Sequence, residues 1–314
     1  KANLKGGTGR RKESAKKFAD EHGVQAYDDV PAIAADPAID FAIIVTPPNA
    51  RLDLIEPLAD AGKPILLEKP VARTGSEAEA VVKLCEEAGV KLGIVFQHRM
   101  REASKKATEL VASGALGALG VVEINVPWWR EQAYYDEPGR GTYARDGGGV
   151  LISQAIHTLD LALSLTGPVA SVQAMTATSR FHTMEAEDFA TAGLRFENGA
   201  IGSLVASSAS FPGGAETITL HFNKASLHLG SGVLTVSWRN GETETFGASA
   251  TTGGGADPMA FTHEWHQGII EDFADAITEG RDPVVTGRTA LASHALIDAI
   301  TQSSNEARAV MVTS

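Results

Sequence analysis

Hydrophobic and polar positions follow two different patterns along the chain, and the change comes near residue 102. Before it, short runs of apolar residues alternate with segments that have helical spacing. Three of these runs are expected to be strands, at 41–45, 64–67 and 92–96. Short strands that are apolar throughout are typical of a parallel sheet covered by helices on both faces.

The segments between these runs predict helices, and most of them end at a glycine, a common helix terminator. The helices are expected at 13–22, 30–35, 49–61 and 76–88. Strands that alternate with helices bring their carboxyl ends to one edge of the sheet, where ligands bind in open α/β sheets. The first part of the chain therefore predicts an α/β nucleotide-binding unit.

From residue 103 the pattern indicates a large, mostly antiparallel open sheet with helices. After a helix expected at 103–113, several segments alternate apolar and polar residues and are joined by turn sequences such as Glu-Asn-Gly. The expected strands are 121–126, 172–179, 189–196, 199–207, 216–222, 225–230 and 232–238. Helices are predicted at 150–166, 264–279 and 287–307. Residues 247–258, rich in Gly, Thr and Ala, are interpreted as a mobile connection.

Composition narrows the class of protein. The chain has 314 residues and a net charge of −12, which disfavours binding to nucleic acid or to an anionic membrane surface. No segment reaches the roughly 20 apolar residues that span a bilayer, and no secretory leader is visible. Cys85 is the single cysteine, and the remaining side chains show no spacing that predicts a metal site. We therefore expect a cytoplasmic protein that acts on a small-molecule substrate.

Thr46-Pro47-Pro48-Asn49-Ala50 directly follows the strand expected at 41–45. The prolines end the strand and turn the chain over its end, and Asn49 is placed to cap the next helix. The motif by itself is more often a plain strand-to-helix turn.

Glu68-Lys69-Pro70 follows the strand at 64–67 and places Lys69 at the edge where ligands bind. An ammonium there can hydrogen-bond a substrate hydroxyl and stabilise its developing alkoxide, and burial lowers its pKa toward a useful range. A lysine beside a glutamate is more often a solvated surface pair. The apolar residues before it favour a site.

Gly147-Gly148-Gly149 precedes the long apolar helix, on which Ser153, His157 and Asp160 are spaced i, i+4, i+7. In a helix they form one polar stripe. A histidine in this position can accept a hydroxyl proton while hydride leaves the same carbon. A lone histidine is more often a core residue bonded to a neighbour such as Asp160. Three polar groups behind a triple glycine favour function.

In this order and spacing, the three motifs resemble the glucose–fructose oxidoreductase, inositol dehydrogenase and rhizopine catabolism (Gfo/Idh/MocA) family over nearly the whole chain. The resemblance implies a dinucleotide-binding Rossmann domain at 1–102. It also implies a substrate-binding domain at 103–314, whose open sheet assembles a homo-oligomer, a dimer or tetramer. The implied reaction moves hydride between NAD or NADP and a secondary alcohol or ketone of a sugar, inositol or related compound.

The resemblance also assigns roles to single residues. It makes Lys69 the catalytic lysine and His157 the catalytic histidine. The residues that it places along the dinucleotide are Thr46, Pro47, Asn49, Glu68 and Lys69. Many family members carry an aspartate four residues before the histidine, where this chain has Ser153, followed by Gln154. A serine supplies no carboxylate to orient the imidazole, so proton transfer would depend on His157 and Lys69.

The start of the chain departs from a complete Rossmann pattern. The first strand and its Gly-x-Gly-x-x-Gly loop are expected to be missing, and residues 3–9 are aligned with the end of the second strand. Arg10 and Arg11 then stand where an acidic residue would bind the ribose, which favours NADP over NAD by a small margin. Solvated charges opening a helix explain these arginines nearly as well.

Further candidates surround the expected cleft. Gln97 and His98 follow the strand at 92–96 and are predicted to face the nicotinamide or the substrate. Trp129 and Arg145 belong to an aromatic and basic run suited to a hydroxylated or carboxylated ligand, or to packing or a subunit contact. With Ser153 and Asp160, these four complete the predicted substrate-binding residues. His263 and His266 are interpreted as structural or rim residues.

Three functions stay open at this point. A Ser-Gln pair before the histidine also fits a cyclic dihydrodiol dehydrogenase. A tightly held nucleotide would also serve hydrolysis or elimination through a transient ketone. The missing acid is also compatible with an inactive, ligand-binding sensor of the same fold.

Overall fold

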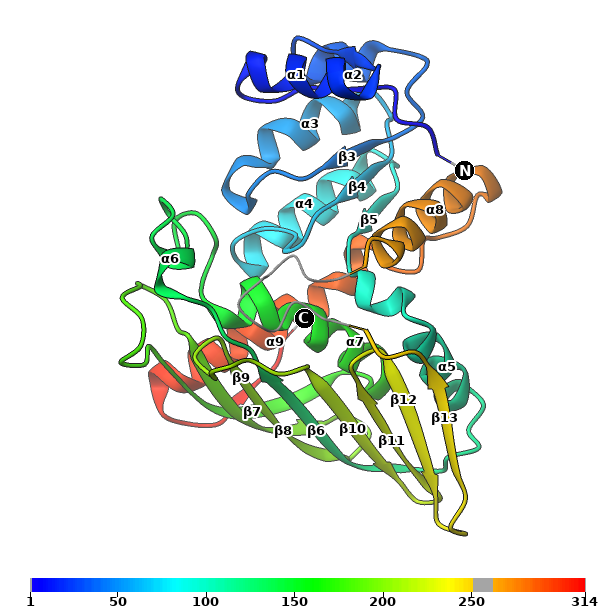
Figure 1. Ribbon diagram of the computed structural model, residues 1–314, viewed down its shortest axis with the longest axis vertical. Helices are drawn as coiled ribbons and strands as arrows, with labels where there is room; N and C mark the ends of the chain where they lie inside the picture. The colour runs from blue at the N-terminus through cyan, green and yellow to red at the C-terminus, as the bar shows by residue number, and fades with distance from the viewer. Residues whose placement is uncertain (1, 251–261, 314) are drawn as a thin grey trace.

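The computed structural model describes residues 2–250 and 262–313 and arranges them in two lobes (Figure 1). The upper lobe contains short parallel strands flanked by helices, and the lower one contains a nine-stranded sheet. The predicted fold class is confirmed. The segment predicted to be a mobile connection lies mostly at residues 251–261, outside the described residues.

Three strands form the centre of the upper lobe: β3 (Ala42–Ile44), β4 (Ile65–Leu67) and β5 (Leu92–Ile94). They pair in parallel in that order, as their apolar sequences predict. Helices α3 (Leu52–Asp60) and α4 (Gly75–Glu87) connect them and bury their apolar faces against the strands.

A second, two-stranded parallel sheet lies beside these strands. It consists of β1 (Gly6–Gly7) and β2 (Gln25–Ala26), joined through α1 (Lys12–His22), and α2 (Val30–Ala35) follows. A Cβ atom on Gly6 would collide with the carbonyl oxygen of Gln25, so the close approach of these strands requires glycine. β1 lies within residues 3–9, which the sequence aligned with the end of a strand, whereas β2 carries no strand-like hydrophobic pattern and was not predicted.

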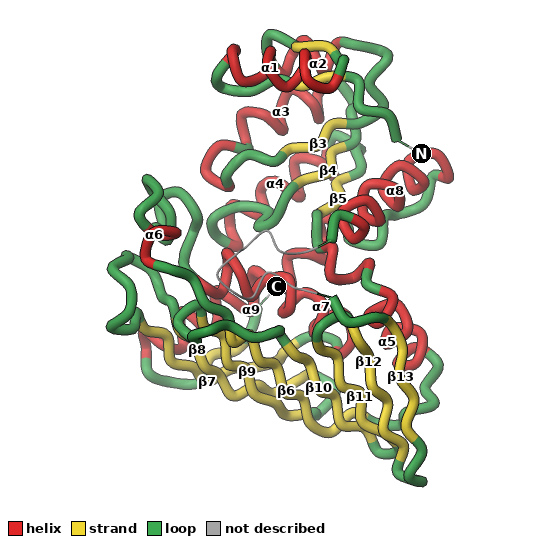
Figure 2. Tube along the Cα trace, in the orientation of Figure 1, coloured by secondary structure: helices red, strands yellow, loops and turns green. Residues whose placement is uncertain are grey.

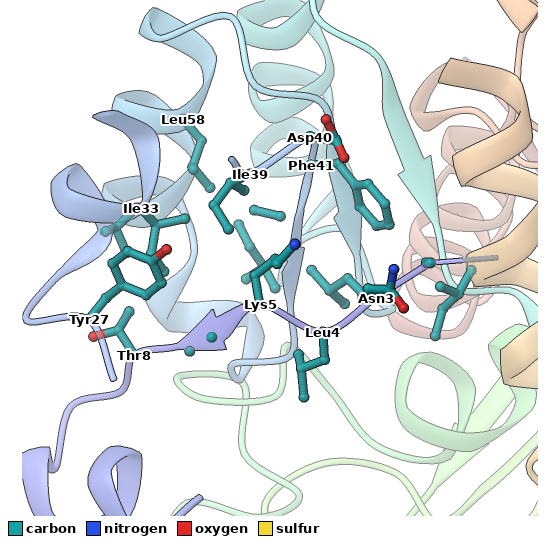
Figure 3. Close-up of a pocket in the computed structure, with 18 of the residues that line it drawn as sticks. Asn3, Leu4, Lys5, Thr8, Tyr27, Ile33, Ile39, Asp40, Phe41 and Leu58 are labelled. Atoms are coloured by element: carbon teal, nitrogen blue, oxygen red, sulfur yellow. The ribbon is translucent and has the colours of Figure 1, made fainter. Parts of the chain in front are cut away.

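A cavity of about 810 Å³ separates the two parallel sheets (Figure 3). Residues 2–8 line it on the β1 side and residues 38–46 on the β3 side. Among the described residues, β1 pairs only with β2 and β3 only with β4, so an edge of each sheet borders the cavity. Ile43 and Val45 on the β3 side are exposed apolar residues.

The lower sheet has the strand order β13-β12-β11-β10-β6-β9-β8-β7-β14. All neighbours are antiparallel except the central pair of β6 (Leu119–Pro127) and β9 (Ile201–Ser207). The other strands are β7 (Val169–Ala177), β8 (Phe189–Phe196), β10 (Thr217–Phe222), β11 (Ala225–Gly230), β12 (Val233–Trp238), β13 (Thr243–Gly247) and β14 (Val310–Met311). Alternating burial along β6, β8 and β10 shows that one face packs against the core.

Helices α5 (Glu102–Ala112), α7 (Ile156–Thr166) and α9 (Gly287–Glu306) lie between this sheet and the upper lobe (Figure 2). The short helix α6 (Gln132–Tyr135) belongs to the lower lobe and lies on the side that faces the upper lobe (Figure 1). Helix α8 (Glu264–Glu279) packs on the parallel strands, where Phe273 contacts Phe41 with ring centroids 5.4 Å apart. Helix α8 comes after residue 102 in the sequence but packs against the upper lobe. The division of the chain into two domains at residue 102 stays a prediction.

Candidate active site

The candidate site lies where the carboxyl ends of β3, β4 and β5 meet the helices of the lower lobe. β3 leads into Thr46-Pro47 and the 3₁₀ turn Pro48–Ala50, β4 into Glu68-Lys69-Pro70, and β5 into the 3₁₀ turn Gln97–Met100. The predicted cap at Asn49 is wrong, because Asn49 lies inside the turn and α3 begins at Leu52 without a side-chain cap.

Lys69 connects the two lobes. Its Nζ donates a hydrogen bond to the main-chain carbonyl of Ser153, 2.7 Å away, one turn before His157. Burial is the main cause that lowers the pKa of Lys69, and Glu68 opposes that shift while Arg51 reinforces it. The ammonium is thus held at the start of the helix that carries the histidine.

The predicted helix at 150–166 consists of two parts. Residues Leu151–Ala155 form a π-helical turn, and α7 continues from Ile156. The buried carboxylate of Glu187 accepts hydrogen bonds from the amides of Gly149 (3.1 Å) and Leu151 (3.0 Å), which caps this end. A Cβ on Gly149 would overlap the carbonyl of Glu187, so glycine is required there. The turn directs the Ser153 carbonyl toward Lys69.

His157 lies in a packed, water-poor environment with 7% of its surface exposed. Its ring stacks on that of His98, with centroids 4.9 Å apart, and meets the edge of Phe96 at 5.9 Å. Its Nδ1 is buried and has no hydrogen-bond partner among the described residues. A buried, unpartnered ring nitrogen indicates that a ligand or water completes this site.

The charges around His157 favour a neutral imidazole. Burial is the largest cause that lowers its pKa well below the usual 6.5, followed by the charges of Lys69, His266 and Arg101. A positive charge on any of these three side chains opposes protonation of the ring. A neutral imidazole at pH 7 is ready to accept a proton.

Asp160 binds to Arg99 and not to His157. Its two carboxylate oxygens accept hydrogen bonds from Nε and Nη2 of Arg99, both at 2.7 Å. The pair fastens the turn at 97–100 to α7 and so brings His98 against His157. The polar stripe predicted on the helix is therefore not one unit, because Asp160 pairs with Arg99 from the turn after β5. A substrate contact of Asp160 stays a prediction.

Two amide side chains at the site are poised for a ligand. Gln97 and Gln154 are buried, and the Oε1 atom of each has no hydrogen-bond partner among the described residues. Gln154 donates from Nε2 to the hydroxyl of Tyr134, 3.3 Å away. Arg140 lies over the Tyr134 ring, and its charge also acts on Lys69. The side chains near Lys69 thus offer donors and acceptors suited to hydroxyl groups.

Trp129 and Arg145 occupy different surroundings. Trp129 packs edge-on against the exposed rings of Phe181 and Phe211, and its Nε1 donates to Glu131. Arg145 donates to the carbonyl of Pro138, 3.0 Å away. No interaction of either residue joins it to Lys69 or His157, and their role in substrate binding stays a prediction.

The residues present fit the nicotinamide half of a dinucleotide. The orphaned Oε1 of Gln97 is an acceptor for a carboxamide, and it lies on the turn after β5, beside the loops that carry Thr46 and Lys69. Arg10 and Arg11 are exposed between β1 and α1. The 810 Å³ cavity reaches this area at Thr46, but neither Lys69 nor His157 lines it.

Sequence reasoning missed several residues of the site. The buried Arg51 binds the loops after β3 and β4. The carboxylate of Glu216 accepts from Arg101 at 2.7 Å and lies 4.0 Å from His98. The charge of His266 acts on His157, and that of Lys69 acts on His266, whereas the sequence indicated a structural or rim residue. None of these residues has a local sequence signal, because their partners are distant in the chain.

No group of described residues forms a candidate metal centre, and no described helix is long and apolar enough to cross a bilayer.

Known proteins share both the sequence and the fold of this chain. It is 27% identical over 308 residues to a D-apiose dehydrogenase from Rhizobium rhizogenes, which covers 94% of this chain and 86% of that protein. A scyllo-inositol 2-dehydrogenase (NAD(+)) from Bacillus subtilis is 26% identical over 285 residues, covering 88% of this chain and 78% of the relative.

The WlbA dehydrogenase from Bordetella pertussis, solved with NADH and UDP-GlcNAcA, superimposes with a TM-score of 0.81 at 28% identity, covering 98% of this chain and 89% of that one. Residues 1–96 match the "oxidoreductase family, NAD-binding Rossmann fold", and residues 104–228 match the "GFO/IDH/MocA C-terminal domain". The chain therefore belongs to the Gfo/Idh/MocA family of oxidoreductases.

Proposed function

We propose that this protein is an NAD(P)-dependent dehydrogenase in which Lys69 and His157 act together on one secondary alcohol. The observation that carries the proposal is the hydrogen bond of 2.7 Å from Lys69 to Ser153, one turn before a buried histidine with an unpartnered Nδ1. An ammonium and a neutral imidazole from different lobes thus border the same space.

Lys69 serves to hold the substrate hydroxyl. Its ammonium has donors beyond the one that Ser153 accepts, and a second donor can bind the oxygen of the alcohol. As the O–H bond breaks, the positive charge stabilises the negative charge that develops on that oxygen. Burial strengthens this interaction, because it excludes water from the pair.

His157 serves to accept the hydroxyl proton. Its pKa is lowered by burial and by neighbouring cations, so the ring stays neutral below the pH at which an ordinary histidine becomes protonated. Oxidation of the alcohol needs this neutral form, and the acid limb of kcat/KM is therefore expected below pH 6.5. Lys69 loses its proton below the usual 10.5, which brings the alkaline limb to lower pH.

A bound nicotinamide would supply the hydride acceptor. Gln97 would bind its carboxamide, Thr46, Pro47 and Asn49 would line the dinucleotide, and Glu68 would lie at its ribose. Arg10 and Arg11 support NADP over NAD by a small margin, since arginines accommodate a 2′-phosphate.

The substrate that we propose is a sugar, an inositol or a related polyhydroxylated compound. Buried, unpartnered acceptors at Gln97 and Gln154 favour several hydroxyl groups over an apolar ring such as that of a dihydrodiol. The relatives named for D-apiose and scyllo-inositol support the same class.

Assembly through the open sheet follows from its uncovered face. Large apolar side chains are exposed on that face, among them Val121, Met175, Ile201 and Val205. A contiguous apolar face of this kind favours contact with a second copy. The homo-oligomer and the cytoplasmic location stay predictions.

The deciding experiment follows a labelled hydride. The protein is incubated with NAD or NADP and with sugars, inositols and dihydrodiols that carry deuterium at the carbinol carbon, and the reduced cofactor is analysed by mass spectrometry. Deuterium in the cofactor with a polyol supports the proposal. Stabilisation by a substrate without any transfer of label would instead identify a sensor, and product without net reduced cofactor would identify hydrolysis or elimination.

A further inference from the structure

Arg51 is an unusual buried cation beside the catalytic lysine. It has 3% of its surface exposed, and its guanidinium forms no ion pair with a carboxylate among the described residues. Instead, Nε donates to the carbonyl of Thr46 at 2.9 Å, and Nη1 donates to the carbonyl of Glu68 at 2.6 Å. The carbonyls of Lys69, Pro70 and Val71 complete its surroundings.

These contacts join the loop after β3 to the loop after β4, in addition to the main-chain hydrogen bond of 2.9 Å from the amide of Glu68 to the carbonyl of Ile44. Thr46 belongs to the loop after β3, and the other acceptors belong to the loop after β4 that carries Lys69. The planar fork of an arginine offers five donors in fixed directions, which a lysine does not. One side chain therefore fixes the path of the main chain on both sides of Lys69.

A buried positive charge at the start of a helix, as at Arg51, is unfavourable in free energy. Burial lowers its pKa to about 10, because the charged form loses hydration. Arg51 is also the N-cap residue of α3, where the helix dipole disfavours a positive charge. Neither cost is offset by a carboxylate hydrogen bond.

The charge of Arg51 also acts on Lys69 itself. It reinforces the lowering of the Lys69 pKa that burial begins, in opposition to Glu68. Removal of this charge is expected to raise the pKa of Lys69, and water entering the vacated space would act in the same direction.

We infer that Arg51 is a positioning residue for catalysis, which fixes the loop of Lys69 through the main chain and sets the charge next to its ammonium. The inference rests on the proposed function, since it concerns the residue that holds the substrate oxygen. It adds a residue that touches neither substrate nor cofactor.

Two variants separate geometry from charge. Arg51→Lys keeps the charge and loses the fork, so kcat is expected to fall at least tenfold, with KM for the polyol within twofold and the alkaline limb unchanged. Arg51→Gln loses both, so kcat falls further and the alkaline limb moves to higher pH. Arg288→Gln is the matched control, because Arg288 forms hydrogen bonds with Glu79 and Glu86 far from these loops. Its profile is expected to match the wild type.

A measurement without catalysis tests the same claim. Trace acetylation of the folded protein with acetic anhydride across pH, read by peptide mass spectrometry, reports the pKa of Lys69, with the exposed Lys83 as an internal reference. Arg51→Gln is expected to shift the Lys69 curve to higher pH and to leave that of Lys83 in place. If no variant transfers hydride, the proposed function has failed, and these curves still decide the role of Arg51.

Two results would contradict the positioning role of Arg51. Wild-type kcat in Arg51→Lys, or a wild-type Lys69 curve in Arg51→Gln, would reduce Arg51 to a structural residue. If Arg51→Gln does not fold, Arg51→Lys decides alone: a loosened loop should acetylate Lys69 at least threefold faster at alkaline pH, and an unchanged rate would refute the positioning role.

Discussion

The two halves of the site are built by different means. Lys69 stands in a loop between a strand and a helix, and one buried arginine holds that loop through main-chain carbonyls. His157 stands on a helix and is held by ring stacking, by deep burial and by the pair of Arg99 and Asp160. The lysine half thus depends on hydrogen bonds of its main chain, those of Arg51 and that of the Val71 amide to His294, whereas the histidine half depends on the core of the lower lobe.

Electrostatics distinguishes the halves further. Burial lowers the pKa of both groups, but Glu68 works against this shift at Lys69, while the neighbouring side chains named at His157 all lower its pKa further. The negative charge of Glu68 accordingly favours the ammonium form of Lys69, whereas the surroundings of His157 favour its neutral form. The comparison predicts that the two halves respond differently to substitution.

The largest effects are expected from the two catalytic groups. Removal of the base in His157→Gln should lower kcat by about 10²–10⁴-fold, the usual contribution of general base catalysis. Lys69→Met, which removes the charge at the developing alkoxide, should lower it at least as much. Initial rates of reduced-cofactor formation measure both effects. The matched controls are Lys83→Met and His228→Gln, whose side chains are exposed. If either site variant kept wild-type turnover, the division of roles would be wrong.

The next effect concerns the stability of the histidine half. Asp160 is 1% exposed and pairs with Arg99, so Asp160→Asn leaves the arginine without its charged partner. Breaking a buried pair costs roughly 3 kcal/mol of unfolding free energy. Chemical denaturation followed by circular dichroism measures this change. A loss below about 1 kcal/mol would show that packing alone holds α7 against the turn at 97–100.

A smaller effect concerns the acid limb of the rate. Ser153→Asp places a carboxylate one helical turn before His157, and a nearby negative charge favours the protonated ring. The pKa of His157 rises, so the acid limb of kcat/KM should move up by about one pH unit. Ser153→Asn has the same shape without the charge and should leave the limb in place. Equal profiles for both variants would mean that the helix turn points this side chain away from the ring.

The smallest effect is expected in the loop after β3. The hydroxyl of Thr46 donates to the carbonyl of Ala50 at 3.2 Å in a partly exposed turn. Because Arg51 holds this loop, Thr46→Val should change the unfolding free energy by less than about 0.5 kcal/mol. Thermal unfolding tests this value. A loss of unfolding free energy close to that of Asp160→Asn would show that the hydroxyl of Thr46 also stabilises the loop that Arg51 holds.

The sequence predicted those parts of the fold whose hydrophobic pattern is long or unbroken. The apolar runs of β3, β4 and β5 and the alternating residues of β8 and β10 left little choice of element. The strand β2, Gln25–Ala26, escaped detection because two exposed residues carry no hydrophobic pattern. The π-helical turn at Leu151–Ala155 also escaped, since it depends on the carboxylate of Glu187, which lies 36 residues away from Leu151 along the chain.

The residues of the candidate site were also predicted only where a local pattern marks them. Lys69 and His157 could be proposed from the sequence because their motifs are local and lie at the ends of elements. Arg51 had the appearance of an ordinary residue at a helix start, because its partners are main-chain carbonyls that no sequence pattern marks. The stripe of Ser153, His157 and Asp160 was predicted as one unit, and the pairing of Asp160 with Arg99 depended on a turn from the other lobe.

The cavity between β1 and β3 leaves two strand edges available for pairing in this structure. Two strand edges border it, with Ile43 and Val45 exposed beside them. Open edges flanked by apolar side chains recruit extended segments of other molecules and promote aggregation. A charged side chain at position 45 would discourage such pairing, one residue before the Thr46 carbonyl that binds Arg51.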